Sequence, residues 1–283
     1  MTTTPFSLTP DQFAAFRQYI YSKCGIYFQA DKKYLLEGRL QQRIVALKLP
    51  DAAAYLKFLQ TSAMAKAEMD GLFDAITINE TYFYRHPAQI DTFRDKLVPE
   101  ILETRKKAGR NEIRLWSAAC STGDEPYTLA LALREKLGSS LPQWKTYIYA
   151  CDLSPKVLIP AKAGLYNDYS VRHIPQPLKD RYLRADGPGK WVLDPTIRSM
   201  VTFDQANLSA TEHLPRTRDM DVIFCRNVLI YFDAPAKTKV IESFYQSLRP
   251  GGSLIIGPAE SLHGIHKGFK MVLHNGAVVY KKE

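Results

Sequence analysis

Polar residues follow three segments of the sequence that have the composition of short buried strands. They are the loop SAACSTGDEPY after Trp116, Asp152 at the end of TYIYACD, and Arg226-Asn227 after MDVIFC. In a mostly parallel sheet with helices on both faces, ligands bind at the carboxyl ends of the strands, beside the loop after the first strand and the acidic end of the second. We therefore expect these polar residues to share one binding site.

The loop after Trp116 has the composition of a segment whose backbone approaches a ligand closely. Its residues are small, Gly123 permits an unusual φ, and Pro126 can start the next helix. The sequence has no GxGxxG fingerprint, no P-loop lysine and no nucleophile elbow. Asp152 is placed to accept hydrogen bonds from two ribose hydroxyls, or alternatively to cap the helix that begins near Ser154. This combination favours an adenosyl ligand without phosphates over a dinucleotide.

A regular alternation of strand and helix patterns positions these residues. The segments in order are EIRLWSA, PYTLALALREKL, TYIYACD, SPKVLIPAKAG, MDVIFCR, APAKTKVIESFYQSL, GGSLIIG and AVVYKK. This alternation predicts an α/β fold with a doubly wound, mostly parallel sheet. Over residues 166–203 the alternation stops, prolines accumulate, and β-like runs appear at 190–193 and 198–203. We therefore predict a small inserted β subdomain over about 166–203.

The N-terminal part of the chain has a helical pattern instead. Thr9 and Pro10 combine a capping residue with proline at the first helical position. Further helices are predicted over 32–49, from 51 onward, over 63–76 and over 87–107. The chain is thus expected to divide into an all-helical domain, residues 1–80, and an α/β domain, residues 81–283.

Composition narrows the class of protein. The chain has 283 residues, of which 46% are hydrophobic and 24% charged, as in ordinary globular proteins. No apolar stretch approaches the roughly 18 residues of a membrane helix, and the N-terminus lacks a signal segment, so we expect a cytoplasmic protein without membrane insertion. The net charge of +9 suits nucleic acid or an acidic protein surface equally, but the basic residues are scattered, so no nucleic-acid partner is expected. The cysteines are widely spaced, which predicts reduced, packed thiols and no metal site.

Six segments together resemble the CheR family of chemotaxis protein-glutamate methyltransferases. They are INETYFYR (78–85), LWSAACSTGDEPYTLA (115–130), ACDLSPKVLIPAKAGLY (150–166), FDQANL (203–208), VIFCRNVLIYFD (222–233) and LRPGGSLIIGPAESL (248–262). Any one would be a weak signal, whereas the ordered set is specific and spans most of the chain. Three positions depart from the usual pattern of the family: GPAES replaces GHSES, ACDLS replaces ATDIS, and His86 stands where an acid is frequent.

The resemblance implies a receptor-docking helical domain and an S-adenosylmethionine-dependent methyltransferase domain that carries the inserted β subdomain. S-adenosylmethionine would be the methyl donor and S-adenosylhomocysteine the product. The cofactor-binding positions carried over from the family are Asn79, Thr81, Arg85, Glu125, Asp152, Asn207, Leu208, Arg226 and Asn227. Arg85 and Tyr231 correspond to the side chains that flank the transferred methyl group, so both are predicted to be catalytic.

The implied reaction methylates glutamate side-chain carboxylates of chemoreceptors, the methyl-accepting chemotaxis proteins, and gives glutamate methyl esters in chemosensory adaptation. A glutamate with a pKa of about 4.3 is already ionised near neutral pH, so the site must align it rather than deprotonate it. Arg85 could clamp the cofactor carboxylate or steer the substrate, and we favour the clamp because an arginine that grips the nucleophile would weaken it. Tyr231 would orient a carboxylate oxygen, unless it is only an aromatic packed at the strand end.

In the family, the helix predicted over 32–49 faces the cytoplasmic helical bundle of the receptor, whose methylation regions are acidic. The residues predicted to dock on this bundle are Lys32, Lys33, Arg39 and Arg43. The alternative is a solvated helix face, which is the usual reason for such charges. A monomer is expected.

Two other functions account for part of the sequence. A methyltransferase that acts on RNA or a small molecule would explain the positive charge but would not need the helical domain, and its RNA binding would be salt-sensitive. A module that senses the cofactor without catalysis would be expected to lack Arg85 or Tyr231, and both are present. Methylation of protein carboxylates therefore remains the favoured interpretation.

Overall fold

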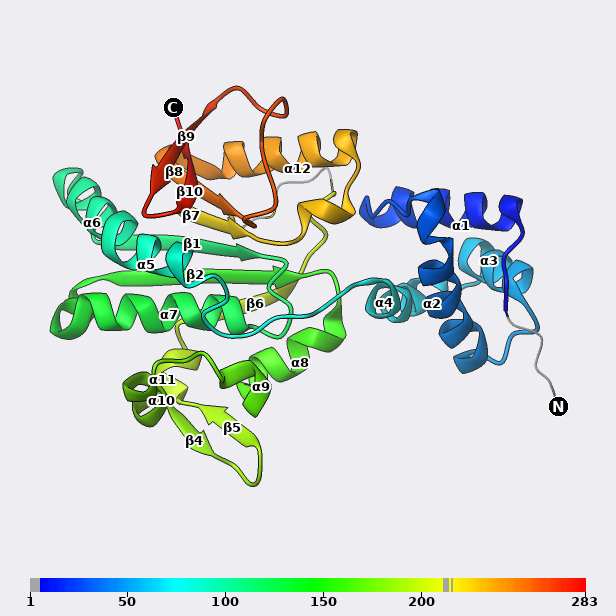
Figure 1. Cartoon of the computed structure of the whole chain (residues 1–283), viewed down its shortest axis with the longest axis horizontal. Helices are drawn as coiled ribbons and strands as arrows, with labels where there is room; N and C mark the ends of the chain where they lie inside the picture. Colours follow the sequence, from blue (N-terminus) through cyan, green and yellow to red (C-terminus); the bar gives the residue numbers. More distant parts are fainter. Residues whose placement is uncertain (1–5, 211–213, 215) are drawn as a thin grey trace.

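The computed structural model describes residues 6–210, 214 and 216–283. Its N-terminal part is a module of four α-helices (Figure 1). These are α1 (Pro10–Cys24), α2 (Lys33–Ala46), which follows the short 3-10 helix η1 (Ala30–Lys32), α3 (Ala52–Thr61) and α4 (Ala65–Ile76). The predicted cap of α1 is present, because the Thr9 side chain accepts the Gln12 N–H while the Gln12 side chain accepts the Thr9 N–H. Apolar faces of the four helices form a core of their own around Phe16, Tyr55 and Leu72.

Seven strands form one sheet in the order β6-β2-β1-β7-β8-β10-β9. Their bounds are β1 (Glu112–Ala118), β2 (Lys145–Asp152), β6 (Val201–Gln205), β7 (Met220–Cys225), β8 (Leu248–Ile256), β9 (Phe269–His274) and β10 (Ala277–Lys282). The neighbouring strand pairs β6–β2, β2–β1, β1–β7 and β7–β8 are parallel. At the edge of the sheet, β10 pairs antiparallel with β8 and β9 pairs antiparallel with β10. The chain moves from β1 toward β2 and β6, then returns to β7 on the other side of β1. A crevice for a ligand is expected outside the carboxyl ends of β1 and β7, where this direction reverses.

Helices cover both faces of the sheet, as the alternation predicts. The helices that accompany the sheet are α5 (Pro87–Thr92), α6 (Val98–Lys107), α7 (Asp124–Leu137), α8 (Pro155–Ala163) and α12 (Ala234–Ser247). A π-helical segment, η2 (Phe93–Leu97), joins α5 to α6, and a 3-10 helix, η3 (Gly138–Gln143), follows α7. On one face, α5 to α8 pack on Leu115 and Phe224, and on the other α12 packs on Trp116 and Ile223.

The insert after α8 contains helices as well as strands. Its elements are β3 (Leu165–Asn167), α9 (Asp168–Val171), α10 (Gln176–Tyr182), β4 (Leu183–Ala185), β5 (Lys190–Leu193) and α11 (Pro195–Arg198). The three strands form a separate antiparallel sheet in the order β3-β5-β4. The prediction that 198–203 belongs to the insert was wrong for residues 201–203, which lie in β6 and pair with β2 in the main sheet. A local β-like pattern does not reveal which sheet a strand joins, since that depends on partners distant in sequence.

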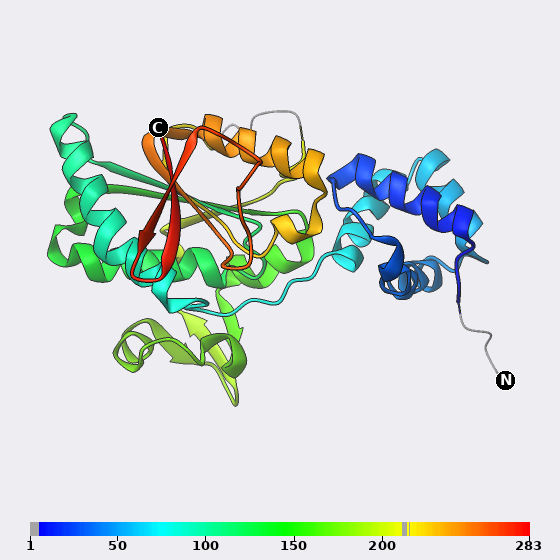
Figure 2. The same cartoon turned by 45° about the horizontal axis from the view of Figure 1, so that its top comes forward.

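The parallel strands β6, β2, β1, β7 and β8 point their carboxyl ends toward the helical module (Figures 1 and 2). The segment after α4 leaves the module, passes the carboxyl ends of the strands and continues to the start of α5 (Figure 1). In the described part of the chain, no helix is long and apolar enough to cross a membrane.

Candidate functional site

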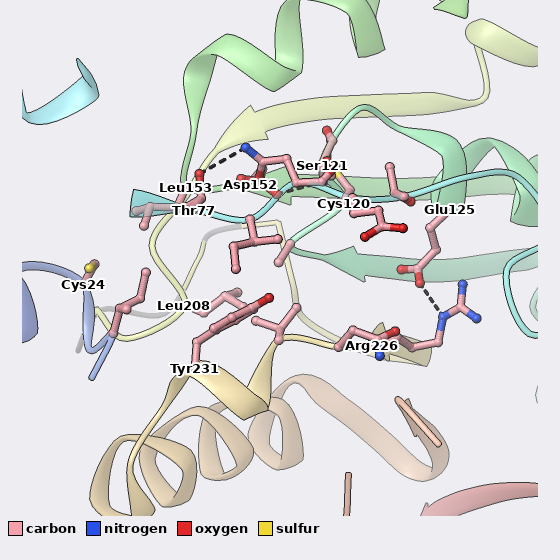
Figure 3. A pocket seen from close by; sticks show the side chains of 18 of the residues that line it. Cys24, Thr77, Cys120, Ser121, Glu125, Asp152, Leu153, Leu208, Arg226 and Tyr231 are labelled. Atoms are coloured by element: carbon pink, nitrogen blue, oxygen red, sulfur yellow. Dashed lines mark hydrogen bonds and ion pairs between the residues drawn. The ribbon is translucent and has the colours of Figure 1, made fainter. Parts of the chain in front are cut away.

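A cavity of about 950 Å³, measured with its open mouth, lies between the helical module and the carboxyl ends of β1, β2 and β7 (Figure 3). Every residue predicted to bind the cofactor or to be catalytic lines it. These are Asn79, Thr81, Arg85, Glu125, Asp152, Asn207, Leu208, Arg226, Asn227 and Tyr231. They come from five separate stretches of sequence, so the topology of the sheet is what brings them together.

The loop after β1 forms one wall through its backbone. Ala119 and Ser121 have positive φ values of 58° and 49°, and Gly123 has 86°. A Cβ at Gly123 would lie 3.0 Å from the Cβ of Ala161, so this position has little room for a side chain. These turns aim the Ser121 N–H at Asp152, and the loop passes close to the cavity without bulky side chains.

Asp152 is 5% exposed, and each of its two carboxylate oxygens accepts a hydrogen bond from a backbone N–H group. The Ser121 N–H donates to Oδ2 at 2.8 Å and the Ser154 N–H donates to Oδ1 at 2.9 Å. Burial raises the pKa of this carboxyl, and the backbone N–H groups oppose the rise. Asp152 therefore accepts a backbone N–H at the start of α8 and also lines the cavity, and its binding to ribose hydroxyls stays a prediction.

Glu125 and Arg226 form a buried ion pair at another part of the cavity (Figure 3). Arg226 Nε donates to Glu125 Oε2 at 2.6 Å, and the Ser117 hydroxyl donates to Glu125 Oε1 at 2.7 Å. Arg226 also donates through Nη1 to the carbonyl of Arg85 at 2.5 Å and to Gln89 Oε1 at 3.2 Å. The pair thus joins β1, α7 and the end of β7 to the segment that carries Arg85.

Tyr231 lies at the end of a 3-10 helix, η4 (Leu229–Tyr231), and lines the cavity (Figure 3). Burial raises the pKa of its phenol, while the nearby cations of Arg39 and Arg85 oppose the rise. Since the ordinary pKa of tyrosine is about 10, the hydroxyl is protonated at neutral pH and can donate a hydrogen bond.

Glu260, which is not among the residues predicted for the site, shapes the turn that leads to Tyr231. Its carboxylate accepts the N–H groups of Asn227 at 3.0 Å, Val228 at 2.9 Å and Gly257 at 2.6 Å. Asn227 is held there with a φ of 61°. The acid in GPAES could have indicated this role, but two of the N–H groups that it binds, those of Asn227 and Val228, lie more than thirty residues earlier in the sequence.

The helical module forms part of the cavity wall, which was also not predicted. Cys24 and Ile26, at the end of α1, line the cavity. The Tyr27 N–H donates to the carbonyl of Tyr231 at 2.9 Å, and Asn207 Nδ2 donates to the carbonyl of Lys23 at 2.7 Å. The amide of Asn207 therefore ties the module to the sheet.

The predicted docking residues lie outside the cavity and differ in their surroundings. Arg43 donates to buried Glu68 through Nε at 2.8 Å and Nη2 at 2.6 Å, so its charge is used inside the module. Arg39 is partly buried and donates to the carbonyl of Ile76. Lys32 is exposed, and Lys33 forms an ion pair at 3.3 Å with Glu37.

Comparison with known proteins identifies the family. The model described as "CheR methyltransferase, SAM binding domain" matches residues 79–277, and the one described as "CheR methyltransferase, all-alpha domain" matches residues 11–77. The chain belongs to the CheR methyltransferase family. All of the cavity residues predicted from the sequence fall in the part that matches the S-adenosylmethionine-binding domain. The family resemblance and the fold class inferred from the sequence are thereby confirmed.

Curated relatives in the CheR family match over nearly their whole length. Chemotaxis protein methyltransferase 2 of Vibrio cholerae is 36% identical over 97% of this chain and 94% of its own. Chemotaxis protein methyltransferase 1 of Pseudomonas aeruginosa is 34% identical over 95% of this chain and 97% of its own. The chemotaxis protein methyltransferase of Borreliella burgdorferi is 32% identical over 98% of this chain and 95% of its own.

The side chains of the cavity fit the adenosyl methyl donor of the CheR family. Carboxylates of Asp152 and Glu125 can accept hydrogen bonds from ribose hydroxyls and an amino group. Among the described residues, Asn227 Oδ1 is buried without a hydrogen-bond partner, which leaves an acceptor for a ligand. Leu208 and Ile26 supply apolar surface. Within the same residues, no three His, Cys, Asp or Glu side chains are grouped so as to hold a metal ion.

Proposed function

We propose that this chain transfers a methyl group from S-adenosylmethionine to glutamate side-chain carboxylates of chemoreceptors in the cytoplasm. The observation that carries the proposal is the meeting of Arg85, Tyr231 and the other residues implied by the family in one cavity. The proposal keeps the expected division into a receptor-docking helical domain, residues 1–80, and a methyltransferase domain, residues 81–283. It also keeps a monomer as the acting form.

In this proposal Asp152 accepts hydrogen bonds from the ribose of the donor, and the Glu125–Arg226 pair receives its amino acid end. Apolar residues such as Leu208 and Ile26 cover the adenine. The donor supplies an electrophilic methyl group on a sulfonium centre. Residues of the helical module as well as of the sheet line the site, which limits the access of water to the bound donor and so favours electrostatic interactions there.

The residues at the reaction centre align a nucleophile that is already ionised. The protonated Tyr231 donates its O–H to one oxygen of the substrate carboxylate and leaves the other free. Arg85 contributes a fixed positive charge, which we assign to the carboxylate of the donor. With alignment as the main task, no general base is required.

Docking of the substrate is assigned to the basic face that begins at η1. Lys32 is exposed and Lys33 has a single surface partner, so both can approach an acidic helical bundle. Arg39 is half-buried between this face and the cavity, where its charge acts on Tyr231. Arg43 is assigned a structural role because Glu68 holds it.

The proposal is tested by transfer of labelled methyl from S-adenosylmethionine to a receptor signalling fragment. Alkali releases methyl esters as volatile methanol but leaves N-methyl groups in place, so the volatile counts identify carboxyl esters. We expect volatile counts that disappear when the receptor glutamates are changed to alanine. Tyr231→Phe should lower the turnover number while leaving donor affinity nearly unchanged. Tight donor binding with no volatile counts on several receptors would reject the glutamate reaction.

A further inference from the structure

The insert packs against the segment that carries Arg85 into the cavity. Residues 78–81 and Arg85 line the cavity, while Tyr82 and Phe83, two of the three residues between them, contact the insert around α9. We propose that Tyr169 and Arg172 of the insert are positioning residues that hold this segment, and with it Arg85, in the geometry needed to bind the methyl donor. The inference rests on the role of Arg85 in the proposed function.

The inner part of the contact is a buried anchor. The Phe83 N–H donates to the carbonyl of Ser170, in α9, at 3.0 Å. The Phe83 ring is fully buried and packs edge-on against Tyr166, with 4.7 Å between ring centroids. This anchor fixes where the segment crosses the insert, but it does not by itself set the direction of the side chains on either side.

The outer part of the contact is a cluster of aromatic and charged side chains. The Arg172 guanidinium lies 3.6 Å from the ring centroid of Tyr169 and 4.0 Å from that of Tyr82, so it holds the two rings together. The Arg85 guanidinium also lies 5.8 Å from the centroid of Tyr82. Tyr82 therefore contacts the cation of the insert and the cation of the cavity at once.

Glu80 provides a second connection between the insert and Arg85. The Tyr169 hydroxyl donates to Glu80 Oε1 at 3.0 Å, and the carbonyl of the same Glu80 accepts a hydrogen bond from Arg85 Nη1 at 2.9 Å. The insert thus fixes the side chain of Glu80, while the backbone of Glu80 fixes Arg85. A loss of the Tyr169 hydroxyl would release one end of this chain of contacts.

The exposure of these groups separates a positioning role from a role in stability. Tyr169 is 49% exposed and Arg172 is exposed, and a hydrogen bond or cation–π contact at such a site adds little to the free energy of unfolding. Lys179 offers a matched control in the same insert, because its Nζ lies 3.8 Å from the ring centroid of Trp191, away from the residue 78–85 segment.

The test compares Tyr169→Phe and Arg172→Ala with Lys179→Ala in the full-length protein. S-adenosylhomocysteine binding is measured by calorimetry, so the readout does not require a receptor substrate. We expect the first two variants to weaken binding three- to tenfold and Lys179→Ala to have no effect, with thermal midpoints that all stay within about 2 °C of the parent. Arg172→Lys should recover part of the affinity because it keeps the charge but not the planar stacking.

A double-variant comparison decides whether the effect passes through Arg85. If it does, adding Tyr169→Phe to Arg85→Ala should cause little further loss of affinity. Additive losses, equal effects of Lys179→Ala, or an Arg85→Ala variant that binds as tightly as the parent would each overturn the inference. Failure to methylate receptors, with the affinity pattern intact, would instead reject only the proposed substrate.

Discussion

Glu125 and Arg226 are separated by 2.6 Å between Oε2 and Nε, and both are buried beside the cavity. Breaking such a pair leaves the other charge without compensation, and the cost is about 3–5 kcal/mol when one partner is removed. The pair also holds the carbonyl of Arg85 through Arg226 Nη1. In the proposed function, the ion pair therefore connects stability and donor binding in one contact.

Glu125→Ala should accordingly lower both the free energy of unfolding and the affinity for S-adenosylhomocysteine. We expect a loss of several kcal/mol in urea unfolding and at least a tenfold weaker affinity by calorimetry. Glu103→Ala is the control, since Glu103 forms an exposed surface pair with Lys107 at 2.6 Å and its loss should leave stability nearly unchanged. Equal effects of the two substitutions would contradict the assignment of Glu125 to the site.

Arg43 and the pair Lys32–Lys33 should respond differently to substitution. Among the described residues, Arg43→Ala leaves the buried carboxylate of Glu68 with the Tyr55 hydroxyl as its one remaining hydrogen-bond partner, so the free energy of unfolding should fall by about 3 kcal/mol. The double substitution of Lys32 and Lys33 to alanine should leave stability nearly unchanged and raise the KM for the receptor fragment. The increase should shrink at high salt, because the contact is electrostatic.

These two variants are distinguished by combining urea unfolding with methylation kinetics at low and high ionic strength. A stable Arg43→Ala variant with a raised KM for the receptor fragment would show that Arg43 contributes to docking rather than to stability. A double lysine variant with an unchanged KM would remove the basic face from substrate recognition.

Asp124 should make stability depend on pH in the slightly acidic range. The residue is fully buried, and burial raises its pKa to about 6, although the Thr122 hydroxyl donates to Oδ2 at 2.6 Å. The unfolded chain has the ordinary value near 3.8. Between these two values the folded state binds a proton that the unfolded state does not, so this group stabilises the fold as the pH falls and its contribution is lost as the pH rises through 6.

Asp124→Asn removes this titration. The variant should be more stable than the parent by on the order of 2 kcal/mol at pH 7.5, where the parent carries a buried carboxylate. The difference should decrease steadily below pH 6 and level off near pH 4. Urea unfolding of both proteins at several pH values measures it, and a difference that does not change with pH would show that the carboxyl of Asp124 is not the titrating group.

The features predicted from sequence are those with a local signal. EIRLWSA coincides with β1 because a short apolar run that contains Ile and Trp favours a strand, and Asp152 falls at a strand end because an acid stops an apolar run. The parallel topology then brings the ends of β1, β2 and β7 together at one edge, whereas Asn79, Thr81, Arg85 and Tyr231 were predicted only from the family resemblance.

The features that were missed depend on contacts between distant residues. Residues 201–203 have a β pattern, but only pairing with β2 assigns them to the main sheet. Arg43 looks like part of a basic surface until α4 places Glu68 beside it. The contribution of Cys24 to the cavity wall requires the placement of α1 against the sheet, which no periodicity encodes.

The end of α1 should be sensitive to even a single added methyl group. Gly25 has a φ of 72°, and a Cβ there would lie 2.9 Å from the Cβ of Ser209 and 3.3 Å from the ring of Phe232. Gly25→Ala should therefore lower the free energy of unfolding by about 1–3 kcal/mol. Because its neighbours Cys24 and Ile26 line the cavity, S-adenosylhomocysteine affinity should fall as well.

Gly38→Ala provides the opposite case in the same module. Gly38 lies inside α2, and nothing lies within 4 Å of an added Cβ, so alanine should raise stability by about 0.5–1 kcal/mol and leave the affinity unchanged. Urea unfolding and calorimetry on both variants measure the two effects. If Gly25→Ala lost stability but bound the ligand normally, the module would pack against the sheet without shaping the cavity, because a shift of α1 would then leave the binding surface intact.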